Sequence, residues 1–165
     1  MNIFKILLCI LSLGIGATLI MDLWLLILKK FNIPSLNFAL LGRWVGWIFR
    51  GRIQHKSIAH SPEIRHEALI GWVAHYSVGI FFAFSFIFIV GQNWLSQPQL
   101  LPALLFGVIT VLIPFLIMQP AMGSGVAASK TPHTFINRTK SLINHSIFGF
   151  GLFLTAKLLN FLIEN

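Results

Sequence analysis

Four long apolar runs in a short chain constrain its fold more than any other feature of the sequence. They cover residues 6–28, 68–90, 100–119 and 141–163 of 165. Each run has about 20 residues or more, which as a helix spans a hydrocarbon core of about 30 Å. Lipid offers no partners to backbone N–H and C=O groups, so spanning segments are helices or closed barrels. The runs predict an all-α integral membrane protein, a single membrane domain over residues 1–165 with four transmembrane helices in an up-and-down bundle.

Composition and charge agree with this class. Hydrophobic residues make up 56% of the chain and charged residues only 10%, so lipid must solvate much of the surface. The net charge of +8 would suit a nucleic-acid-binding protein, but basic residues beside membrane helices meet anionic headgroups instead. Seven of the twelve lie between the first two runs: Lys29, Lys30, Arg43, Arg50, Arg52, Lys56 and Arg65. We expect membrane lipids as partners, with anionic headgroups at the cytoplasmic face, and no nucleic acid.

The same basic residues predict the orientation of the chain. The connection 29–67 holds seven of them, the connection 120–140 adds Lys130, Arg138 and Lys140, and the connection 91–99 has none. Short loops rich in Lys and Arg stay in the cytoplasm. We therefore expect a multi-pass protein of the bacterial inner (cytoplasmic) membrane, with both termini in the periplasm.

The cytoplasmic loop 29–67 is predicted to contain an interfacial amphipathic helix over about residues 35–50. Its apolar residues recur at helical spacing: Phe38, Leu41, Val45 and Ile48. Ser35 is a suitable N-cap, and the arginines Arg43 and Arg50 would lie among lipid phosphates. Gly42 and Gly46 form either a close-packing seam or simple helix breakers.

The rest of this loop, from Gly51 to Glu67, is polar and holds three histidines. His55, His60 and His66 are irregularly spaced. Their spacing favours a solvated loop over a metal site.

Ionisable side chains inside membrane helices are costly and are functional candidates by default. Asp22 is the only acid inside an apolar run, and His75 and His145 lie in the second and fourth runs. Counted along each helix from the nearest cytoplasmic loop, all three lie roughly 8–12 Å deep. We predict that they converge on one polar cavity in the cytoplasmic half of the bundle, with Thr18 and Asn144 at its edge.

Small residues share the helical faces of these three side chains, and such faces pack closely in membranes. The first, second and fourth runs should therefore be mutual neighbours, with the third run more exposed to lipid. Gln119, at the end of the third run, belongs to a different face, unless a kink at Pro114 re-aims it.

This polar cluster admits several functions. It could fix helix packing in a purely structural membrane partner protein, or exchange protons in small-solute transport or gating. Four helices enclose little more than their own core, so transport implies a homo-oligomer. A third possibility is a membrane-embedded enzyme or binding protein for a lipid headgroup or another anionic amphiphile. A metal site formed by Asp22, His75 and His145 is less favoured because no metal-ligand motif supports it. We expect no metal and no cofactor.

After the third run the chain enters a stretch of small residues that is typical of an unwound or re-entrant segment. Backbone N–H groups of Gly123, Ser124 and Gly125, with Lys130 nearby, could form a weak anion-binding nest. A simple turn is the alternative interpretation.

Several short motifs occur in a characteristic order: GIGATLIMDLW at 14–24, GRWVG at 42–46, GWVAHY at 71–76, MQPAMG at 118–123 and Asn144-His145. Together they resemble a family of small bacterial membrane proteins, catalogued as domain of unknown function twenty-nine thirty-eight. The resemblance covers nearly the whole chain. It implies a four-helix inner-membrane protein, and it supplies no catalytic residue, substrate or cofactor.

Overall fold

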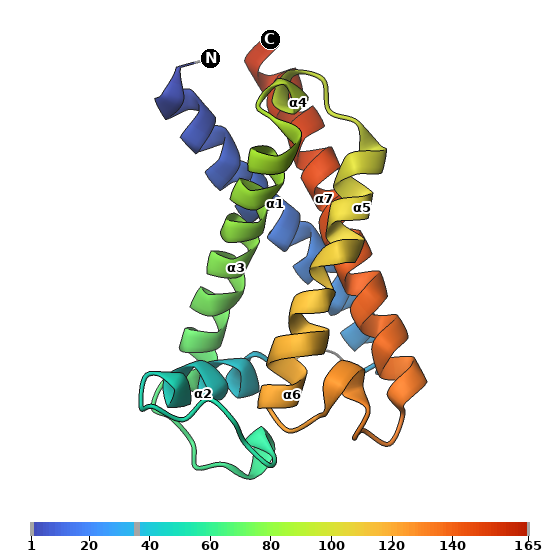
Figure 1. The fold of residues 1–165 in the computed structure, drawn as a ribbon. Coiled ribbons are helices and arrows are strands. Elements are labelled where there is room, and N and C mark those ends of the chain that lie inside the picture. Colours follow the sequence, from blue (N-terminus) through green and yellow to red (C-terminus); the bar gives the residue numbers. More distant parts are fainter. Residues whose placement is uncertain (1, 35–36, 165) are drawn as a thin grey trace. The chain divides into compact units, whose positions relative to one another are not determined.

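The computed structural model describes residues 2–34 and 37–164, and the described chain is helical, with no strand (Figure 1). The α-helices are α1 Ile3–Lys30, α2 Phe38–Ile48, α3 Glu67–Val90, α4 Asn93–Ser96, α5 Leu100–Thr110, α6 Gln119–Ala121 and α7 Thr134–Glu164. Two 3₁₀ turns, Ile58–His60 and Val126–Ala128, and a π-helical turn, Pro114–Met118, complete the elements.

The four predicted spans are confirmed as helices long and apolar enough to cross a membrane: Ile3–Lys30, Glu67–Val90, Leu100–Ala121 and Thr134–Leu162. The first and last helices extend beyond the apolar runs because polar residues at a span's ends continue the helix into the interface. The third span is interrupted at Pro114, whose ring removes a backbone donor and imposes the π turn.

Contacts divide the chain into two units, which we describe separately. Unit 1 comprises Met1–Pro34, Tyr76–Ile109 and Ile143–Asn165, and unit 2 comprises Ser35–His75 and Thr110–Leu142.

In unit 1 the helices pack through small residues, but Gly149, on the predicted face of the last span, packs on the backbone of α5, and Gly151 makes the contact with α1. A methyl group on Gly14 would overlap the backbone of Ile80, and one on Gly151 would overlap Ala17. The rings of Phe82 and Phe148 meet at 6.0 Å, which makes α1, α3 and α7 mutual neighbours. The third span has the smallest buried share of the four, 22%, although α5 also packs closely on α7.

An apolar core fills the part of unit 1 that lies toward α4. Three of its largest side chains, Leu13, Phe86 and Leu152, are fully buried. The core draws on α1, α3, α4, α5 and α7, and within this unit both chain ends lie at the α4 end (Figure 1).

In unit 2, α2 crosses the beginning of α3 so closely that the backbones of the two helices are in contact. A methyl group on Gly42 would overlap the carbonyl of Glu67, and one on Gly71 would overlap the carbonyl of Phe38. Gly42 therefore lies at a close-packing seam, Gly46 packs on the side chain of Ile64, and neither breaks the helix. The predicted N-cap Ser35 lies outside the described residues, and the described helix begins at Phe38 with Asn37 as its cap.

Beyond α6 the chain is unwound, as the small residues predicted. Gly123 and Gly125 have φ of +95° and +74°, a left-handed conformation that side chains disfavour. Gly123 also packs against the carbonyl of Lys56, so this turn and the first loop are held together.

Candidate functional site

The central polar contact of unit 1 joins Asp22 of α1 to Tyr76 of α3. The Tyr76 hydroxyl donates a hydrogen bond of 2.8 Å to Oδ2 of Asp22, and Asp22 is only 8% exposed. A buried carboxylate needs such a donor because desolvation of an unpartnered charge is costly. The pair places an acidic group, held by a neutral donor, inside a membrane span.

The register of α1 and α3 explains why these two residues meet. Gly79 leaves room for Thr18, since a methyl group there would overlap the Thr18 hydroxyl. Four residues further along α1 is Asp22, and three residues back along α3 is Tyr76. In antiparallel helices these steps move both chains by one turn in the same direction.

The predicted edge residues lie in different surroundings. Thr18 is buried, and its hydroxyl donates to the Gly14 carbonyl at 2.7 Å. Asn144 of α7 accepts a hydrogen bond of 3.1 Å from the Trp24 indole N–H. This bond ties α1 to α7 about half a turn beyond Asp22.

The two histidines fall into different units. His145 is in unit 1, where α5 approaches its backbone carbonyl at Gly107. His75 is in unit 2, where its ring lies 4.7 Å from the ring of Phe38 and 6.1 Å from that of Trp72. The convergence of Asp22, His75 and His145 therefore stays a prediction.

Gln119 and the GSG turn belong to unit 2. The Gln119 amide nitrogen lies 3.4 Å from the Ser141 hydroxyl, and its Oε1 is buried without a hydrogen-bond partner. The N–H groups of Gly123 and Ser124 donate to the carbonyls of Pro120 and Gln119. Two donors of the predicted anion nest are thus engaged within the chain, so we do not propose that nest, or Lys130 beside it, as a site.

Among the residues that the structure describes, no three His, Cys, Asp or Glu side chains are grouped so that they could hold a metal ion.

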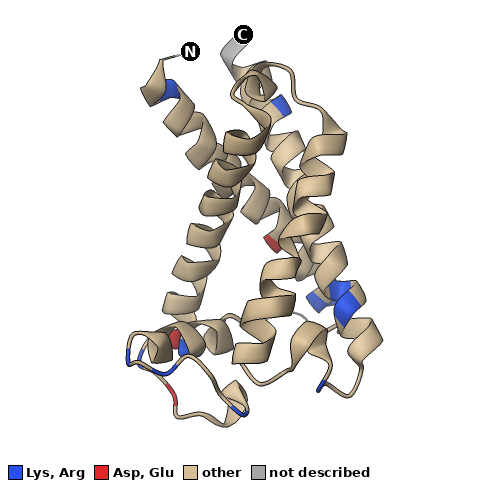
Figure 2. Cartoon of the chain, viewed as in Figure 1, with Lys and Arg blue, Asp and Glu red and all other residues tan. Residues whose placement is uncertain are grey.

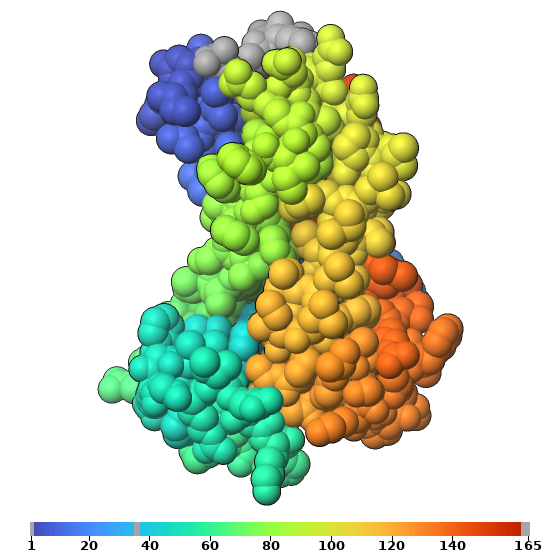
Figure 3. Space-filling view, in the orientation of Figure 1, coloured from blue at the N-terminus to red at the C-terminus, as the bar shows by residue number. Residues whose placement is uncertain are grey.

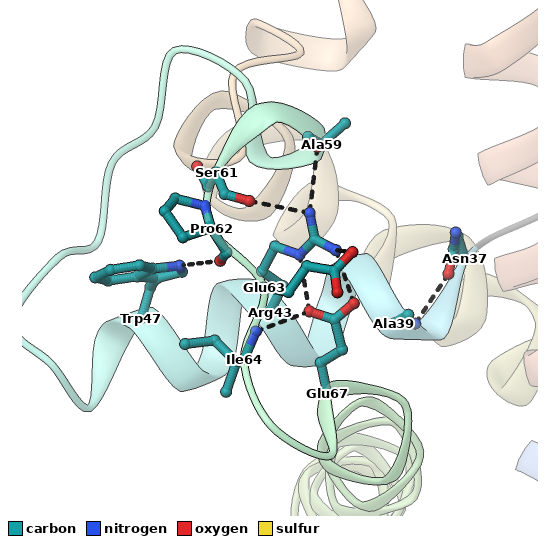
Figure 4. Close-up of polar contacts among 10 residues, drawn as sticks. All are labelled: Asn37, Ala39, Arg43, Trp47, Ala59, Ser61, Pro62, Glu63, Ile64 and Glu67. Carbon is teal, nitrogen blue, oxygen red and sulfur yellow. Dashed lines mark hydrogen bonds and ion pairs between the residues drawn. The ribbon is translucent and has the colours of Figure 1, made fainter.

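Arg43 is not among lipid phosphates, contrary to the sequence-based expectation. Its guanidinium donates to both carboxylate oxygens of Glu67, at 2.8 and 2.7 Å, and to the carbonyls of Ala59 and Ser61 (Figure 4). The hydrogen bonds to Glu67 raise the pKa of Arg43 above its ordinary value, against the opposing effect of burial. The pair fixes the loop to the α2–α3 crossing.

His55 also departs from expectation, because it is buried and not solvated. It is 4% exposed, its Nδ1 lies 2.8 Å from the Ser61 hydroxyl, and its backbone N–H donates to the Ala121 carbonyl. Ser61 donates its own proton to the Ser57 carbonyl, so Nδ1 of His55 is the donor in their contact. The Nε2 atom is buried without a partner.

Four helices long and apolar enough to cross a membrane, joined by loops, define a multi-pass membrane protein. A family model described as "Protein of unknown function (DUF2938)" matches residues 11–159, so the chain belongs to that family, as its motifs indicated. No curated protein and no solved structure matches it.

Proposed function

We propose that this membrane protein works by proton-linked small-solute transport or gating, and that Asp22 is the group that binds the proton. The observation that carries the proposal is the buried carboxylate of Asp22 inside a span, held by the Tyr76 hydroxyl. Such a group can gain a proton without losing its partner, because a tyrosine hydroxyl both donates and accepts hydrogen bonds. Protonation then changes the charge between α1 and α3.

The main apolar core lies on one side of Asp22. On α1 its buried members end at Ala17, Met21 packs against them, and Asp22 follows toward the end that carries Lys29 and Lys30. In Figure 2 the basic residues of unit 1 lie toward helix ends. A proton would therefore reach Asp22 from the Lys29–Lys30 end, while the core blocks the α4 end.

A site that is reached from only one side of a four-helix protein does not provide a continuous path across the membrane. We therefore propose that the working form is a homo-oligomer. In the same proposal His145, Thr18 and Asn144, which belong to the same unit as Asp22, line the path to it. His145 would relay protons, since an imidazole ring has one nitrogen that can accept a proton and one that can donate it.

Changing Asp22 to asparagine should abolish the response to pH while the protein stays folded. The amide keeps the shape of the side chain and can still accept the Tyr76 hydrogen bond, but it cannot bind a proton. The measurement is proton entry into vesicles that contain the purified protein and an internal pH indicator, driven by an imposed membrane potential. Thermal unfolding of the same preparations reports on folding.

Tyr76→Phe is the matched variant, since it removes the hydroxyl and leaves the carboxylate in place. We expect this variant to retain a proton response at altered pH, whereas Asp22→Asn retains none. Equal proton entry in the wild type and in Asp22→Asn contradicts the proposed role.

We also propose that the protein resides in the bacterial inner membrane with both termini in the periplasm, because the basic residues gather in two of the three connections. In a variant with Cys9 replaced by serine, a cysteine at Gln97 should react with an impermeant reagent in intact cells. Cysteines at Lys56 and Arg138 should not react until the cells are opened. Labelling at Lys56 from outside contradicts this orientation.

A further inference from the structure

We propose that the turn after α2 is a binding site for the headgroup of an anionic phospholipid. We call this site the α2 corner and define it by Trp47, Phe49, Arg50, Arg52 and Ile53. It lies within unit 2, and it is independent of the proton-binding role proposed for Asp22.

Two arginines in the α2 corner share one aromatic ring. The guanidinium carbons of Arg50 and Arg52 lie 5.4 and 5.8 Å from the centre of the Trp47 ring. Both side chains are exposed. Both guanidinium groups thus lie around one ring, and arginine binds phosphate oxygens in a bidentate manner.

The acids of unit 2 pair with another residue. Glu63 and Glu67 both form ion pairs with Arg43. These are the only acids of unit 2. Arg50 and Arg52 therefore remain available to an external phosphate.

The geometry of the α2 corner is fixed by hydrogen bonds and not left to a loose loop. The Trp47 indole donates to the Pro62 carbonyl at 3.0 Å, and the Arg52 N–H donates to the Trp47 carbonyl at 2.9 Å. The Trp44 indole donates to the Ile53 carbonyl at 2.8 Å. A site whose side chains are already held in place loses less conformational entropy when it binds a ligand.

Apolar side chains beside the arginines favour a lipid over a soluble anion. Phe49 is 87% exposed and Ile53 is 60% exposed, and they flank Arg50 and Arg52 in the sequence. The segment after α2, teal in Figure 3, lies on the surface of the molecule. Exposed apolar groups that alternate with basic ones are typical of segments that enter the headgroup region of a membrane.

The test uses full-length protein purified in a zwitterionic detergent, with phosphatidylglycerol and phosphatidylcholine as probes. Bound lipid is counted by native mass spectrometry, and lipid-dependent stabilisation is followed by thermal unfolding. The variant Arg50→Gln/Arg52→Gln removes both charges from the α2 corner. The matched control, Arg65→Gln/Lys140→Gln, removes two charges elsewhere in unit 2.

We expect the wild type and the control to bind phosphatidylglycerol in preference to phosphatidylcholine. The double arginine variant should bind it about tenfold more weakly or worse. Phe49→Ser should also weaken lipid binding, and inorganic phosphate should not displace the lipid.

Three results would overturn the proposal. The double arginine variant could bind phosphatidylglycerol as the wild type does, the wild type could bind both lipids equally, or inorganic phosphate could displace the lipid fully. The last result would indicate a site for free phosphate. None of these results depends on Asp22, so the proton-linked function is tested separately.

Discussion

Replacing Arg43 by alanine should lower the free energy of unfolding by about 3 kcal/mol, because it leaves the largely buried carboxylate of Glu67 without its charged partner, with only the Ile64 N–H still donating to it. The Arg43 side chain is 8% exposed and that of Glu67 is 15% exposed. The substitution also leaves the carbonyls of Ala59 and Ser61 without the donor that they share. Loss of these bonds frees the loop from the α2–α3 crossing.

Denaturant unfolding of the purified protein in detergent measures this effect. Arg65→Ala is the control, since Arg65 is exposed and surface substitutions usually change stability by less than about 0.5 kcal/mol. Arg43→Lys should recover only part of the loss, because an ammonium group cannot contact both carboxylate oxygens and two carbonyls in one plane. A loss no larger than that of the control would show that the ion pair does not stabilise the loop.

The second large effect is expected where α2 and α3 cross. Gly42→Ala or Gly71→Ala should each destabilise the protein by about 1–3 kcal/mol or more, because the added methyl group meets backbone that cannot rotate away. The obstructing atoms are the carbonyl groups of Glu67 and Phe38. The helices must separate to relieve the overlap, and this would also disturb the Arg43–Glu67 pair.

Gly46→Ala is the control for the crossing, since it is the same substitution in the same helix. A methyl group on Gly46 meets the side chain of Ile64, which can shift. Unfolding of the three variants under one set of conditions should rank Gly46→Ala as the mildest. If Gly42→Ala is as mild as Gly46→Ala, then the close backbone crossing is not needed for stability.

The sequence predicted the membrane helices because their signal is local. Each span is a continuous apolar run, and the small residues Gly14 and Gly79 marked the faces on which α1 and α3 pack, whereas Gly151, which contacts α1, was not predicted. The contact between α1 and α3 follows from those faces.

The partners of individual side chains were harder to predict, because they depend on the register between distant segments. Tyr76, the only tyrosine, was missed as the partner of Asp22. If Thr18 had been matched with Gly79, a step of one helical turn along both helices would have brought Asp22 next to Tyr76. Arg43 was assigned to lipid because basic residues beside spans commonly face headgroups, and nothing local signals its pairing with Glu67 across 24 residues.

The burial of a loop residue was also not predicted from the sequence. His55 lies in a polar stretch, so its sequence neighbours indicate exposure. Its burial results from backbone hydrogen bonding to Ala121 and from packing beside Trp47, and both contacts come from other elements.

The central claim is that Asp22 binds a proton inside the membrane, and infrared difference spectroscopy of the reconstituted protein tests it most directly. Only three other acidic side chains, Glu63, Glu67 and Glu164, contribute carboxyl signals. As the pH is lowered through the range in which the protein stays folded, we predict a carbonyl-stretching band of a protonated carboxyl group that is absent from Asp22→Asn. Identical difference spectra for the wild type and Asp22→Asn throughout that range would contradict the claim.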